Sequence, residues 1–576
     1  MTVVATAGHV DHGKSTLVRA LTGTDPDRFA EEKARGLTID LGFAACTLPS
    51  GRGLELVDVP GHVRFLSNML AGVGAVGACL FVVAATEGWK PQSEEHLRIL
   101  DLLGVRHGVV ALTKVGLVDD DHATLARMDV EDRLSGSALA GAPLVAVDAV
   151  AGIGVDELRG ALDDLLARTP DAEDRGRTRL WVDRRFAMKG SGTVVTGTLT
   201  GGELNVGDEI EVRPSGRRAR VRGLQTHGEV VERLGPGHRV AVNLSGLSHH
   251  ELERGHAVVM PGRWVSTSRV DASLHILAAL DHDVSRRGAY AVHIGSAEVP
   301  CRLRVLGPDA LDPGGEGFVR LHLATPLALQ PGDRYVLREH GREETVGGGE
   351  ILDVEPVLAA SRAQPDPTVE RVVAERGWVA ADVLERLVGR RVQANVGPWV
   401  ASSAALAATV RGVAEAVVAA DDQGLDPASR SERERLAVAA GLVDGVMLVE
   451  GRWHHGLGWS TTVVDDPWLT AVRANPFSPP PPDAVDRGVL RLLARRGLVE
   501  ERDGVWFAAE AVAEAARLTA GLLEARPEGV TLSELREAWG TSRKWAVPLA
   551  SLLDARGVTR RRGDVRVGGP KLPTLS

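Results

Sequence analysis

The sequence predicts a multidomain fold in which an α/β domain with a phosphate loop is followed by two β-barrels and by C-terminal tandem winged-helix domains. Three observations predict it. A glycine-rich loop, "GHVDHGKST", stands between a β-branched run and a helix-like run near the N-terminus. Alternating β-branched runs with glycine turns fill the middle of the chain, and short helical stretches fill the last third. With 576 residues, the chain is long enough for several separate cores.

The composition is that of a globular protein without a membrane-spanning segment. Hydrophobic residues make up 44% and charged residues 25% of the chain, and no run of about 18 apolar residues occurs. The first residues, "MTVVATAGHV", lack the basic and apolar regions of a signal peptide. The three cysteines lie far apart in sequence, which predicts neither a disulfide framework nor a metal site. We therefore expect a cytoplasmic protein, and a net charge of −10 argues against general nucleic-acid binding.

The loop at residues 8–15 has the spacing G-x-x-x-x-G-K-S. Between a strand and a helix, such a loop turns successive backbone N–H groups towards phosphate oxygens. Lys14 can reach the β- and γ-phosphates of a nucleotide, and the Ser15 hydroxyl can ligate Mg²⁺. The residues predicted to bind the nucleotide here are Gly8, His9, Val10, Asp11, His12, Gly13, Lys14, Ser15 and Thr16.

Two segments after the loop have the character of nucleotide switches. In "EEKARGLTIDLG", Thr38 is placed to ligate Mg²⁺ and to sense the γ-phosphate. In "LELVDVPGH", Asp58 can hold a Mg²⁺-bound water, and the Gly61 N–H can contact the γ-phosphate. His62 follows at once. A loop histidine can lack any role, but a position directly after Asp-x-Pro-Gly favours a catalytic one, the positioning of the attacking water.

Together, "GHVDHGKST", "RGLTID" and "DVPGH" resemble the translational GTPases of the elongation factor Tu family. The resemblance implies an α/β P-loop GTPase domain, placed at residues 1–172, with GTP and Mg²⁺ as its cofactors. It also implies that His62 orders the hydrolytic water when the ribosome engages, so that hydrolysis is slow in the chain alone.

The guanine-reading motif of that family is incomplete in "ALTKVGLVDD", residues 111–120. Thr113 and Lys114 fit the motif, but Gly116 replaces the carboxylate that would accept hydrogen bonds from guanine N1–H and the 2-amino group. In "VAVDAVAGIG", Ala149 keeps the backbone N–H that would meet guanine O6, and Asp148 replaces a serine. Losing two charge-assisted hydrogen bonds could cost about two to four decades of affinity.

Two interpretations of this gap remain open. In one, Asp119 caps the next helix, Asp148 is an ordinary loop acid, and guanine selectivity is weak. In the other, Asp148 or Asp119 substitutes as the hydrogen-bond acceptor. The intact switch motifs argue against a dead nucleotide site, because a degenerate GTPase should lose catalytic positions as readily as base-reading ones.

The middle of the chain predicts two β-barrels, at residues 178–264 and 267–356. The run "FAMKGSGTVVTGTLTGGELNVGDEIEV" resembles the second domain of elongation factor Tu, and the block ending in "TVGGGEILD" resembles its third domain. A further resemblance, to the selenocysteine-specific elongation factors, implies an aminoacyl pocket formed by Asp183, Arg184 and Arg222. Cationic groups there would favour an anionic selenolate over a neutral serine hydroxyl. The alternative is that these residues form ion pairs on the barrel surface.

Residues 364–576 repeat a plan of helix, glycine turn and charged hairpin, which predicts tandem winged helices. The last unit, placed at about residues 520–570, includes "GTSRKWAVPLASLLDARGVTRRRGDVRVG". It resembles the final winged helix of the selenocysteine-specific elongation factors, which binds a messenger RNA hairpin. From residue 531 onward the chain has nine basic and four acidic residues, a local charge of +5. The predicted RNA-binding residues are Arg543, Lys544, Arg560, Arg561, Arg562 and Arg566, and the alternative is a solvated basic face.

The resemblance covers nearly the whole chain and implies a monomeric GTPase that carries selenocysteinyl-tRNA to the ribosome at UGA codons marked by an mRNA hairpin. Two alternatives stand beside it. A nucleotide-gated RNA-binding regulator with degenerate GTPase activity would fit Gly116 and Asp148. A factor closer to the gamma subunit of eukaryotic initiation factor two would lack a winged-helix tail, so the tail argues against it.

Overall fold

The computed structural model describes residues 2–26, 40–61, 68–70, 76–188, 192–420, 423–455, 467–483, 485, 487–495 and 497–574. The chain forms two compact units, Met1–Ala405 and Leu406–Ser576. Within these described ranges, no helix combines the length and the apolar character needed to cross a membrane.

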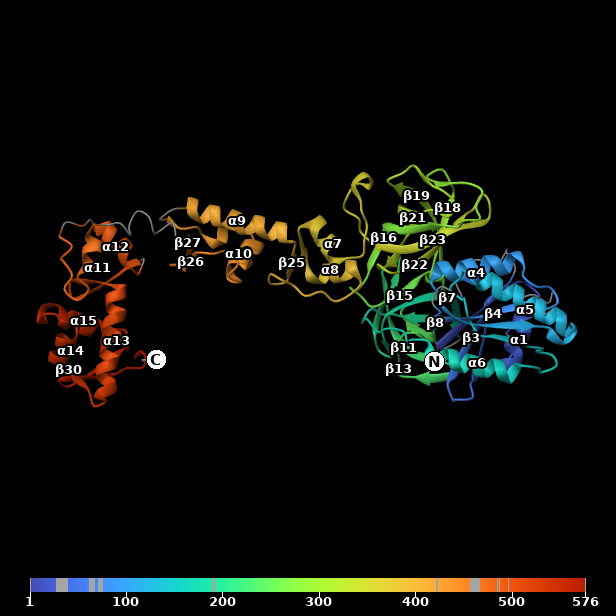
Figure 1. Cartoon of the computed structure of the whole chain (residues 1–576), viewed down its shortest axis with the longest axis horizontal. Helices are drawn as coiled ribbons and strands as arrows, with labels where there is room; N and C mark the ends of the chain where they lie inside the picture. Colours follow the sequence, from blue (N-terminus) through green and yellow to red (C-terminus); the bar gives the residue numbers. More distant parts are fainter. Residues whose placement is uncertain are drawn as a thin grey trace. The chain divides into compact units, whose positions relative to one another are not determined.

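The first domain is a six-stranded sheet with helices on both faces (Figure 1). The strand order is β2-β3-β1-β4-β5-β6, in which β2 is antiparallel to β3 and the other pairings are parallel. The strands are β1 (Thr2–Ala7), β2 (Gly42–Thr47), β3 (Gly53–Asp58), β4 (Ala78–Ala84), β5 (His107–Thr113) and β6 (Leu144–Ala146). The helices are α1 (Lys14–Thr22), α4 (Pro91–Leu103), α5 (Asp120–Leu134) and α6 (Val155–Arg168).

The central strands place their side chains in two cores, one on each face of the sheet. β4 is buried along its whole length, with Phe81 in the core beneath α4 and Leu80 in the core beneath α1 and α6. A strand covered on both faces is continuously apolar, as "ACLFVVA" is. Because the central strands are parallel, their carboxyl ends share one edge, which is where ligands bind in such sheets. There β1 runs into the phosphate loop, and β3 and β5 end in Asp58 and Thr113.

The second domain is an antiparallel barrel in the order β10-β15-β7-β8-β14-β11, closed by the pairing of β10 with β11. β12 extends the sheet beside β11, and β9 and β13 form a small separate pair. The strands are β7 (Arg179–Met188), β8 (Gly192–Thr200), β9 (Leu204–Asn205), β10 (Glu209–Arg213), β11 (Arg217–Thr226), β12 (Glu229–Val231), β13 (Arg233–Leu234), β14 (Arg239–Ser245) and β15 (Ala257–Val259).

The third domain is a closed barrel in the order β16-β21-β19-β18-β22-β23, with β17 and β20 as a small pair beside it. A buried ion pair joins the two barrels, because Arg179 donates to both carboxylate oxygens of Asp333, at 2.7 and 2.6 Å. The strands are β16 (Val265–Ile276), β17 (Val284–Ser285), β18 (Tyr290–Ile294), β19 (Ala297–Leu306), β20 (Ala310–Leu311), β21 (Glu316–Leu329), β22 (Arg334–Glu339) and β23 (Glu344–Asp353).

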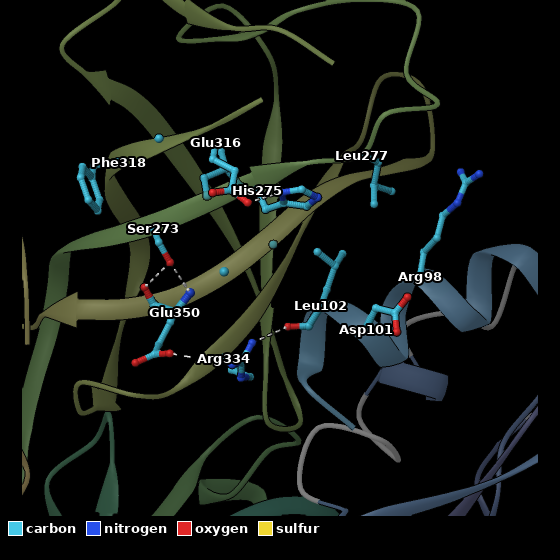
Figure 2. A pocket seen from close by; sticks show the side chains of 14 residues that line it. Arg98, Asp101, Leu102, Ser273, His275, Leu277, Glu316, Phe318, Arg334 and Glu350 are labelled. Carbon is cyan, nitrogen blue, oxygen red and sulfur yellow. Dashed lines mark hydrogen bonds and ion pairs between the residues drawn. The ribbon is translucent and has the colours of Figure 1, made fainter. Parts of the chain in front are cut away.

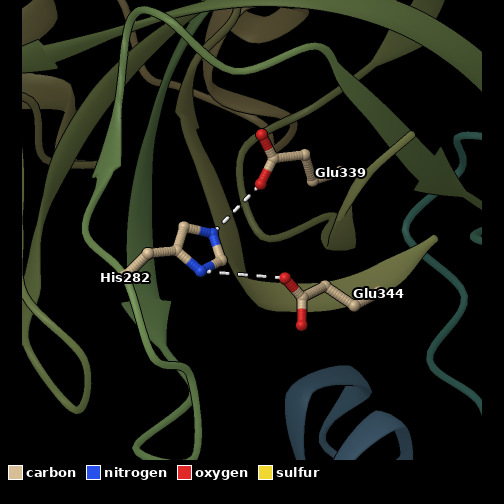
Figure 3. A group of neighbouring side chains, drawn as sticks. All are labelled: His282, Glu339 and Glu344. Carbon is tan, nitrogen blue, oxygen red and sulfur yellow. Dashed lines mark hydrogen bonds and ion pairs between the residues drawn. The ribbon is translucent and has the colours of Figure 1, made fainter. Parts of the chain in front are cut away.

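A histidine flanked by carboxylates ties one side of the third barrel together (Figure 3). His282 Nε2 lies 3.0 Å from Glu339, and its Nδ1 lies 3.0 Å from Asp281 and 3.7 Å from Glu344. Hydrogen bonds to Asp281 and then Glu339 raise the pKa of His282. Arg342 lies 3.3 Å from Asp281 and adds a cation to the cluster. Hydrogen bonds and ion pairs therefore connect these side chains in the described part of the barrel.

Helix α4 of the first domain lies against β22 and β23 of the third barrel (Figure 1). A polar cavity of about 460 Å³ opens at this junction (Figure 2). Arg334 bridges its two sides, with Nη1 3.4 Å from the Leu102 carbonyl oxygen and Nη2 4.0 Å from Glu350. No phosphate-loop residue lines the cavity. Its place marks it as a domain junction.

Small helix-and-hairpin units follow the barrels. The first packs on the third barrel, where Arg371 donates to Asp353 at 2.8 Å. Its elements are α7 (Val369–Arg376), β24 (Trp378–Ala380), α8 (Ala381–Val388) and β25 (Trp399–Ala401). α9 (Ser403–Ala419) contains the boundary between the compact units.

The second compact unit contains further helices followed by hairpins. They are α10 (Glu432–Ala439) with β26 (Val446–Val449) and β27 (Arg452–His455), then α11 (Pro467–Ala474) and α12 (Arg487–Arg495) with β28 (Val499–Arg502) and β29 (Val505–Ala508).

The last winged helix has three helices and a three-stranded sheet in the order β30-β32-β31. Trp539, Leu549 and Leu553 are buried in its core. Its elements are α13 (Ala509–Ala525), β30 (Val530–Thr531), α14 (Leu532–Ala538), α15 (Arg543–Ala555), β31 (Thr559–Arg562) and β32 (Val565–Gly568). The predicted fold class, an α/β domain followed by two barrels and a winged-helix tail, is confirmed.

Candidate functional site

The phosphate loop is shaped by residues in left-handed backbone conformations. Gly8 has φ 131°, and a Cβ at this position would lie 2.1 Å from the Val82 carbonyl oxygen, so only glycine fits. Asp11 (φ 62°) and Gly13 (φ 86°) complete the turn. Gly13 is also the N-cap of α1 and provides no side chain to cap its N–H groups. These N–H groups are therefore suited to phosphate oxygens.

Lys14 lies across the phosphate loop. Its Nζ donates to the carbonyl oxygens of Gly8 at 2.9 Å and His9 at 2.7 Å. Burial lowers the pKa of Lys14 to about 8, although the carboxylates of Asp58 and Asp11 oppose this change. The amine therefore remains mostly protonated at neutral pH and can form a charge-assisted contact with a phosphate.

Asp58 lies beneath the loop and is fully buried. Its Oδ1 accepts from the Thr6 hydroxyl at 2.8 Å, and its Oδ2 accepts from the Ser15 hydroxyl at 2.7 Å. A hydroxyl beside a carboxylate is a set of hard oxygen donors, the type that Mg²⁺ prefers. The two predicted Mg²⁺-site residues Ser15 and Asp58 are thus in contact and fit that ion.

Gly61 packs directly on the loop. A Cβ there would lie 2.4 Å from Lys14 Nζ and 2.6 Å from the Val10 nitrogen. The position therefore needs glycine, and its backbone is close to where a γ-phosphate would lie. Thr38 and His62 lie outside the described residues, so their roles stay predictions.

Two side chains of α4, not anticipated from the sequence, hold the loop from below. The Gly8 N–H donates to His96 Nδ1 at 3.0 Å, and the Val10 N–H donates to Gln92 Oε1 at 3.1 Å. Burial lowers the pKa of His96 to about 3, so its imidazole is neutral and can accept a hydrogen bond. No sequence signal links these residues to the loop, because they lie more than 80 positions away.

The residues expected at the base lie beside the loop. The Thr113 hydroxyl donates to the His12 carbonyl oxygen at 2.7 Å, which ties the end of β5 to the phosphate loop. Lys114 has φ 59°, and its Nζ lies 3.1 Å from Glu87. The structure thus brings the predicted phosphate-binding and base-binding residues together at one edge of the sheet.

Gly116 lies in a single 3₁₀ turn, Val115–Leu117, directly after Lys114. Ala149 and Asp148 follow β6, the strand next to β5. Asp119 is the N-cap of α5, and its carboxylate accepts from the His122 N–H at 2.8 Å. The interpretation of Asp119 as a helix cap is therefore confirmed.

A second candidate site lies between the first domain and the second barrel, in a cavity of about 360 Å³. Arg184 and Arg239 line it, and their guanidinium carbons lie 4.7 and 3.5 Å from the centre of the Phe43 ring. Behind them, Arg239 forms a bidentate ion pair with Asp183, and the Thr196 hydroxyl donates to Asp183 at 2.6 Å. Two cations and an aromatic ring thus face one small cavity. Glu55 also lines it and lies 3.8 Å from Arg239, and Arg184 donates to Asp40 at 2.9 Å.

The last winged helix carries a basic face. Arg543 and Lys544 are exposed at the start of α15, and the exposed β31 contributes a run of three arginines. Arg566 behaves differently. It is 7% exposed, and its Nε donates to Asp554 at 2.9 Å. Of the six predicted RNA-binding residues, five are exposed: Arg543, Lys544, Arg560, Arg561 and Arg562.

Four family models match successive parts of the chain. Residues 1–168 match the elongation factor Tu GTP binding domain, and residues 192–259 match elongation factor Tu domain 2. Residues 267–357 match the beta-barrel domain of selenocysteine-specific elongation factor, and residues 522–567 match the winged helix of elongation factor SelB.

Elongation factor Tu 2 of Streptomyces avermitilis is 31% identical over 61% of this chain and 96% of its own length. The selenocysteine-specific elongation factor of Desulfomicrobium baculatum is 43% identical over 61% of this chain, and that of Escherichia coli (strain K12) is 36% identical over 66%. The chain belongs to the elongation factor Tu family, and its third barrel and its last winged helix match models of selenocysteine-specific elongation factors. The alignments to the two selenocysteine-specific relatives span 55% and 61% of their lengths.

Solved structures of selenocysteine-specific elongation factors share this fold. A crystal structure of bacterial selenocysteine-specific elongation factor EF-Sec has a TM-score of 0.68 and 25% identity, and covers 98% of this chain and 99% of that one. Translation elongation factor SelB from Methanococcus maripaludis, in complex with the GTP analogue GPPNHP, has a TM-score of 0.54 and 25% identity, with 62% and 80% coverage.

The residues predicted to form an aminoacyl pocket are only partly brought together in this chain. Asp183 and Arg184 lie at the 360 Å³ cavity or directly behind it, but Arg222 is exposed on β11 and does not line it. The register of β11 against β14 shifts between Val221 and Gly223, so Arg222 sits at a bulge. The third residue that the structure places there is Arg239, which the sequence interpretation missed.

Proposed function

We propose that the chain is a GTP-dependent elongation factor that delivers selenocysteinyl-tRNA to the ribosome at UGA codons marked by an mRNA hairpin. One observation carries the proposal furthest. A phosphate loop in which Lys14 donates to the Gly8 carbonyl oxygen and Ser15 donates to Asp58 is joined in the same chain to a last winged helix with exposed basic residues. The first suits a nucleotide switch, and the second suits an RNA anchor.

At the nucleotide site, the loop N–H groups and Lys14 would bind the phosphates. Ser15 and Thr38 would ligate Mg²⁺, and Asp58 would hold a Mg²⁺-bound water. When bound, this ion supplies positive charge to the phosphate oxygens on which negative charge develops. The Gly61 N–H would contact the γ-phosphate, and His62 would orient the attacking water. Phosphoryl transfer depends mainly on such positioning, so a ribosome that completes the site would accelerate hydrolysis.

At the cavity beside the second barrel, Arg184 and Arg239 would face the selenocysteine side chain. A selenolate is an anion, whereas the hydroxyl of serine is neutral, so two guanidinium groups favour the former. The bidentate pair with Asp183 fixes the orientation of Arg239. Asp183 is thus a positioning residue in this proposal, and Arg184 and Arg239 are the contacting ones.

At the last winged helix, five exposed cations would bind the hairpin. Arg543 and Lys544 lie at the start of α15, and three arginines lie on β31 of the wing. Charges on two adjacent elements can contact the phosphates that flank a loop, where unpaired bases are accessible. Arg566 is not among them, because it is buried against Asp554.

Ribosome-stimulated hydrolysis tests the proposal. We would measure GTP hydrolysis by the full chain with selenocysteinyl-tRNA and ribosomes programmed with UGA, with the hairpin either present or scrambled. The expected result is stimulation that requires both the tRNA and the intact hairpin, and that is lost in Lys14→Ala. Hairpin binding without stimulated hydrolysis would overturn the proposal and favour a nucleotide-gated RNA-binding regulator.

A further inference from the structure

The loops after β5 and β6 lie side by side at the base end of the nucleotide site. The strands are parallel, with Leu112 opposite Ala146. Beyond them, the Val147 N–H donates to the Leu112 carbonyl oxygen at 2.8 Å. This pairing places Gly116 of one loop next to Asp148 of the other.

The Asp148 carboxylate occupies the space that a side chain at residue 116 would need. A Cβ built on Gly116 would lie 2.4 Å from Asp148 Oδ2 and 3.3 Å from its Cγ. The shorter contact is well below any normal distance between a carbon and an oxygen that are not bonded to each other. A second carboxylate at residue 116 would also repel the first. The space between the two loops therefore has room for one carboxylate, either at residue 116 or at residue 148.

The Asp148 side chain is held in a fixed orientation. Its Oδ1 accepts from the Val150 and Ala151 N–H groups, at 3.0 Å each. Its backbone exchanges two hydrogen bonds with Ile153, also at 3.0 Å. The residue is 7% exposed, and within the part of the chain that the structure describes, Oδ2 accepts no hydrogen bond. One oxygen thus anchors the carboxylate, and the other points to where residue 116 has no side chain.

We propose that Asp148 Oδ2 reads guanine in place of a carboxylate at residue 116. The inference rests on the proposed function, since it assumes that the nucleotide is GTP. Guanine presents N1–H and the 2-amino group side by side, next to O6. An oxygen with two lone pairs can accept from both donors. The N–H of Ala149, the next residue, would then meet O6, so one dipeptide covers the whole edge. Adenine presents an acceptor at N1 and would be rejected.

Nucleotide competition tests this directly. We would displace a fluorescent GTP analogue from the full chain with GTP, ATP, ITP and XTP. Wild-type chain should prefer GTP to ATP. Asp148→Asn should bind GTP about ten- to a hundredfold more weakly and gain affinity for XTP, because its amide donates to the 2-carbonyl of xanthine. If Asp148 had only a structural role, Asp148→Asn would weaken the binding of all four nucleotides by a similar factor.

Two further variants complete the experiment. Asp119→Asn is the matched control, since asparagine also caps helices, and it should leave all four affinities unchanged. The double variant Gly116→Asp/Asp148→Ser returns the carboxylate to the other loop and should restore the preference for GTP. Gly116→Asp alone should not improve it, because its Cβ meets Asp148.

The outcomes separate this inference from the proposed function. An Asp148→Asn chain with the GTP and XTP affinities of the wild type would overturn the inference and leave the proposed function intact. Equal wild-type affinity for GTP and ATP would also overturn the inference, and hairpin-dependent hydrolysis on the ribosome would still decide the function. A chain that binds no nucleoside triphosphate would overturn both.

Discussion

A neutral histidine holds the phosphate loop in place at the scale of single residues. His96 accepts the Gly8 N–H, and the loop would otherwise have a buried donor without a partner. The same lone pair must stay unprotonated for the contact to form. The backbone geometry of the phosphate loop thus depends on His96 of α4, a side chain that would not contact the phosphate itself.

Replacing His96 should therefore affect both stability and pH dependence. His96→Leu leaves the Gly8 N–H unpaired and should cost about 1–3 kcal/mol of unfolding free energy, with weaker GTP binding. The folded-state pKa of His96, about 3, is depressed from 6.5. Its contribution to stability is therefore complete above pH 6.5 and is lost as pH falls towards 3.

His96→Gln keeps an acceptor and cannot titrate, so it should remove up to about 1.4 kcal/mol per pH unit of acid sensitivity in that window. Urea unfolding at several pH values measures this. A His96→Gln chain with the pH profile of the wild type would contradict the assignment.

Arg239 and Arg222 form a matched pair for a second test. Arg239→Met leaves Asp183 buried without its cation and should cost about 3–5 kcal/mol, together with loss of discrimination between selenocysteinyl-tRNA and seryl-tRNA. Arg222→Met changes an exposed side chain and should stay within about 0.5 kcal/mol. Denaturant unfolding and protection of the aminoacyl ester bond measure the two effects. Equal effects of the two variants would contradict the geometry.

The sequence allowed the local part of the nucleotide site to be predicted, and not the tertiary part. Phosphate loops are set by spacing within nine residues, so Lys14 and Ser15 could be identified directly. His96 could not, because its contact depends on how α4 packs. Arg222 was predicted from the resemblance, and Arg239 was missed, since no sequence rule locates the bulge that turns Arg222 outward.

At the scale of an element, the last winged helix shows the same difference between what local sequence predicts and what depends on tertiary contacts. A strand with the sequence "TRRR" pairs with "VRVG", and all three arginines of β31 are exposed. The arginine of β32, Arg566, lies opposite Arg561 in the strand register, but it is buried and donates to Asp554 of α15. Helix periodicity and glycine turns were enough to predict the unit, but one arginine in the basic cluster proved to be structural.

Removing the three arginines of β31 should weaken hairpin binding and reduce its salt dependence. For Arg560→Ala/Arg561→Ala/Arg562→Ala, the slope of log K against log salt should become shallower by about 2, at roughly 0.7 per phosphate contact. Arg517→Ala is the control, since this exposed arginine on α13 pairs with Glu514. Gel-shift titrations at several salt concentrations measure the slope. An unchanged slope would exclude the wing from the interface.

Arg566→Ala should act on stability. Loss of its bond to Asp554 leaves a partly buried carboxylate unpaired and should cost the last unit about 1–3 kcal/mol. Thermal unfolding of the full chain, followed by tryptophan fluorescence, measures this. A variant with wild-type stability and weaker hairpin binding would return Arg566 to the RNA-binding set.

Helix α4 connects parts of the first compact unit at the scale of the whole molecule. Its Gln92 and His96 side chains hold the phosphate loop, and Glu95 lies 3.3 Å from Thr345 of the third barrel. Further along, the barrels are joined by Arg179 and Asp333. The nucleotide site and both barrels are thus linked by named polar contacts as well as by buried apolar surface.

The barrel junction should be sensitive to one substitution. Arg179→Met leaves Asp333 buried and unpaired and should cost about 3–5 kcal/mol, whereas Arg179→Met/Asp333→Leu should recover much of that loss, since a buried apolar pair is often as stable. Denaturant unfolding of the three chains measures the coupling energy. Additive effects in the double variant would mean that the pair does not couple the barrels.

The mutual exclusion of side chains at residues 116 and 148 also constrains how this chain can have arisen. An ancestor with the carboxylate on the first loop could not acquire Asp148 without crowding, and could not lose its own carboxylate without a loss of base recognition. If Asp148 reads guanine as proposed, each single substitution therefore either crowds the two loops or removes the carboxylate that accepts from guanine. Residues 116 and 148 should therefore change together within a lineage. Exchanging one of them for its counterpart in a relative should succeed only if the other is exchanged at the same time.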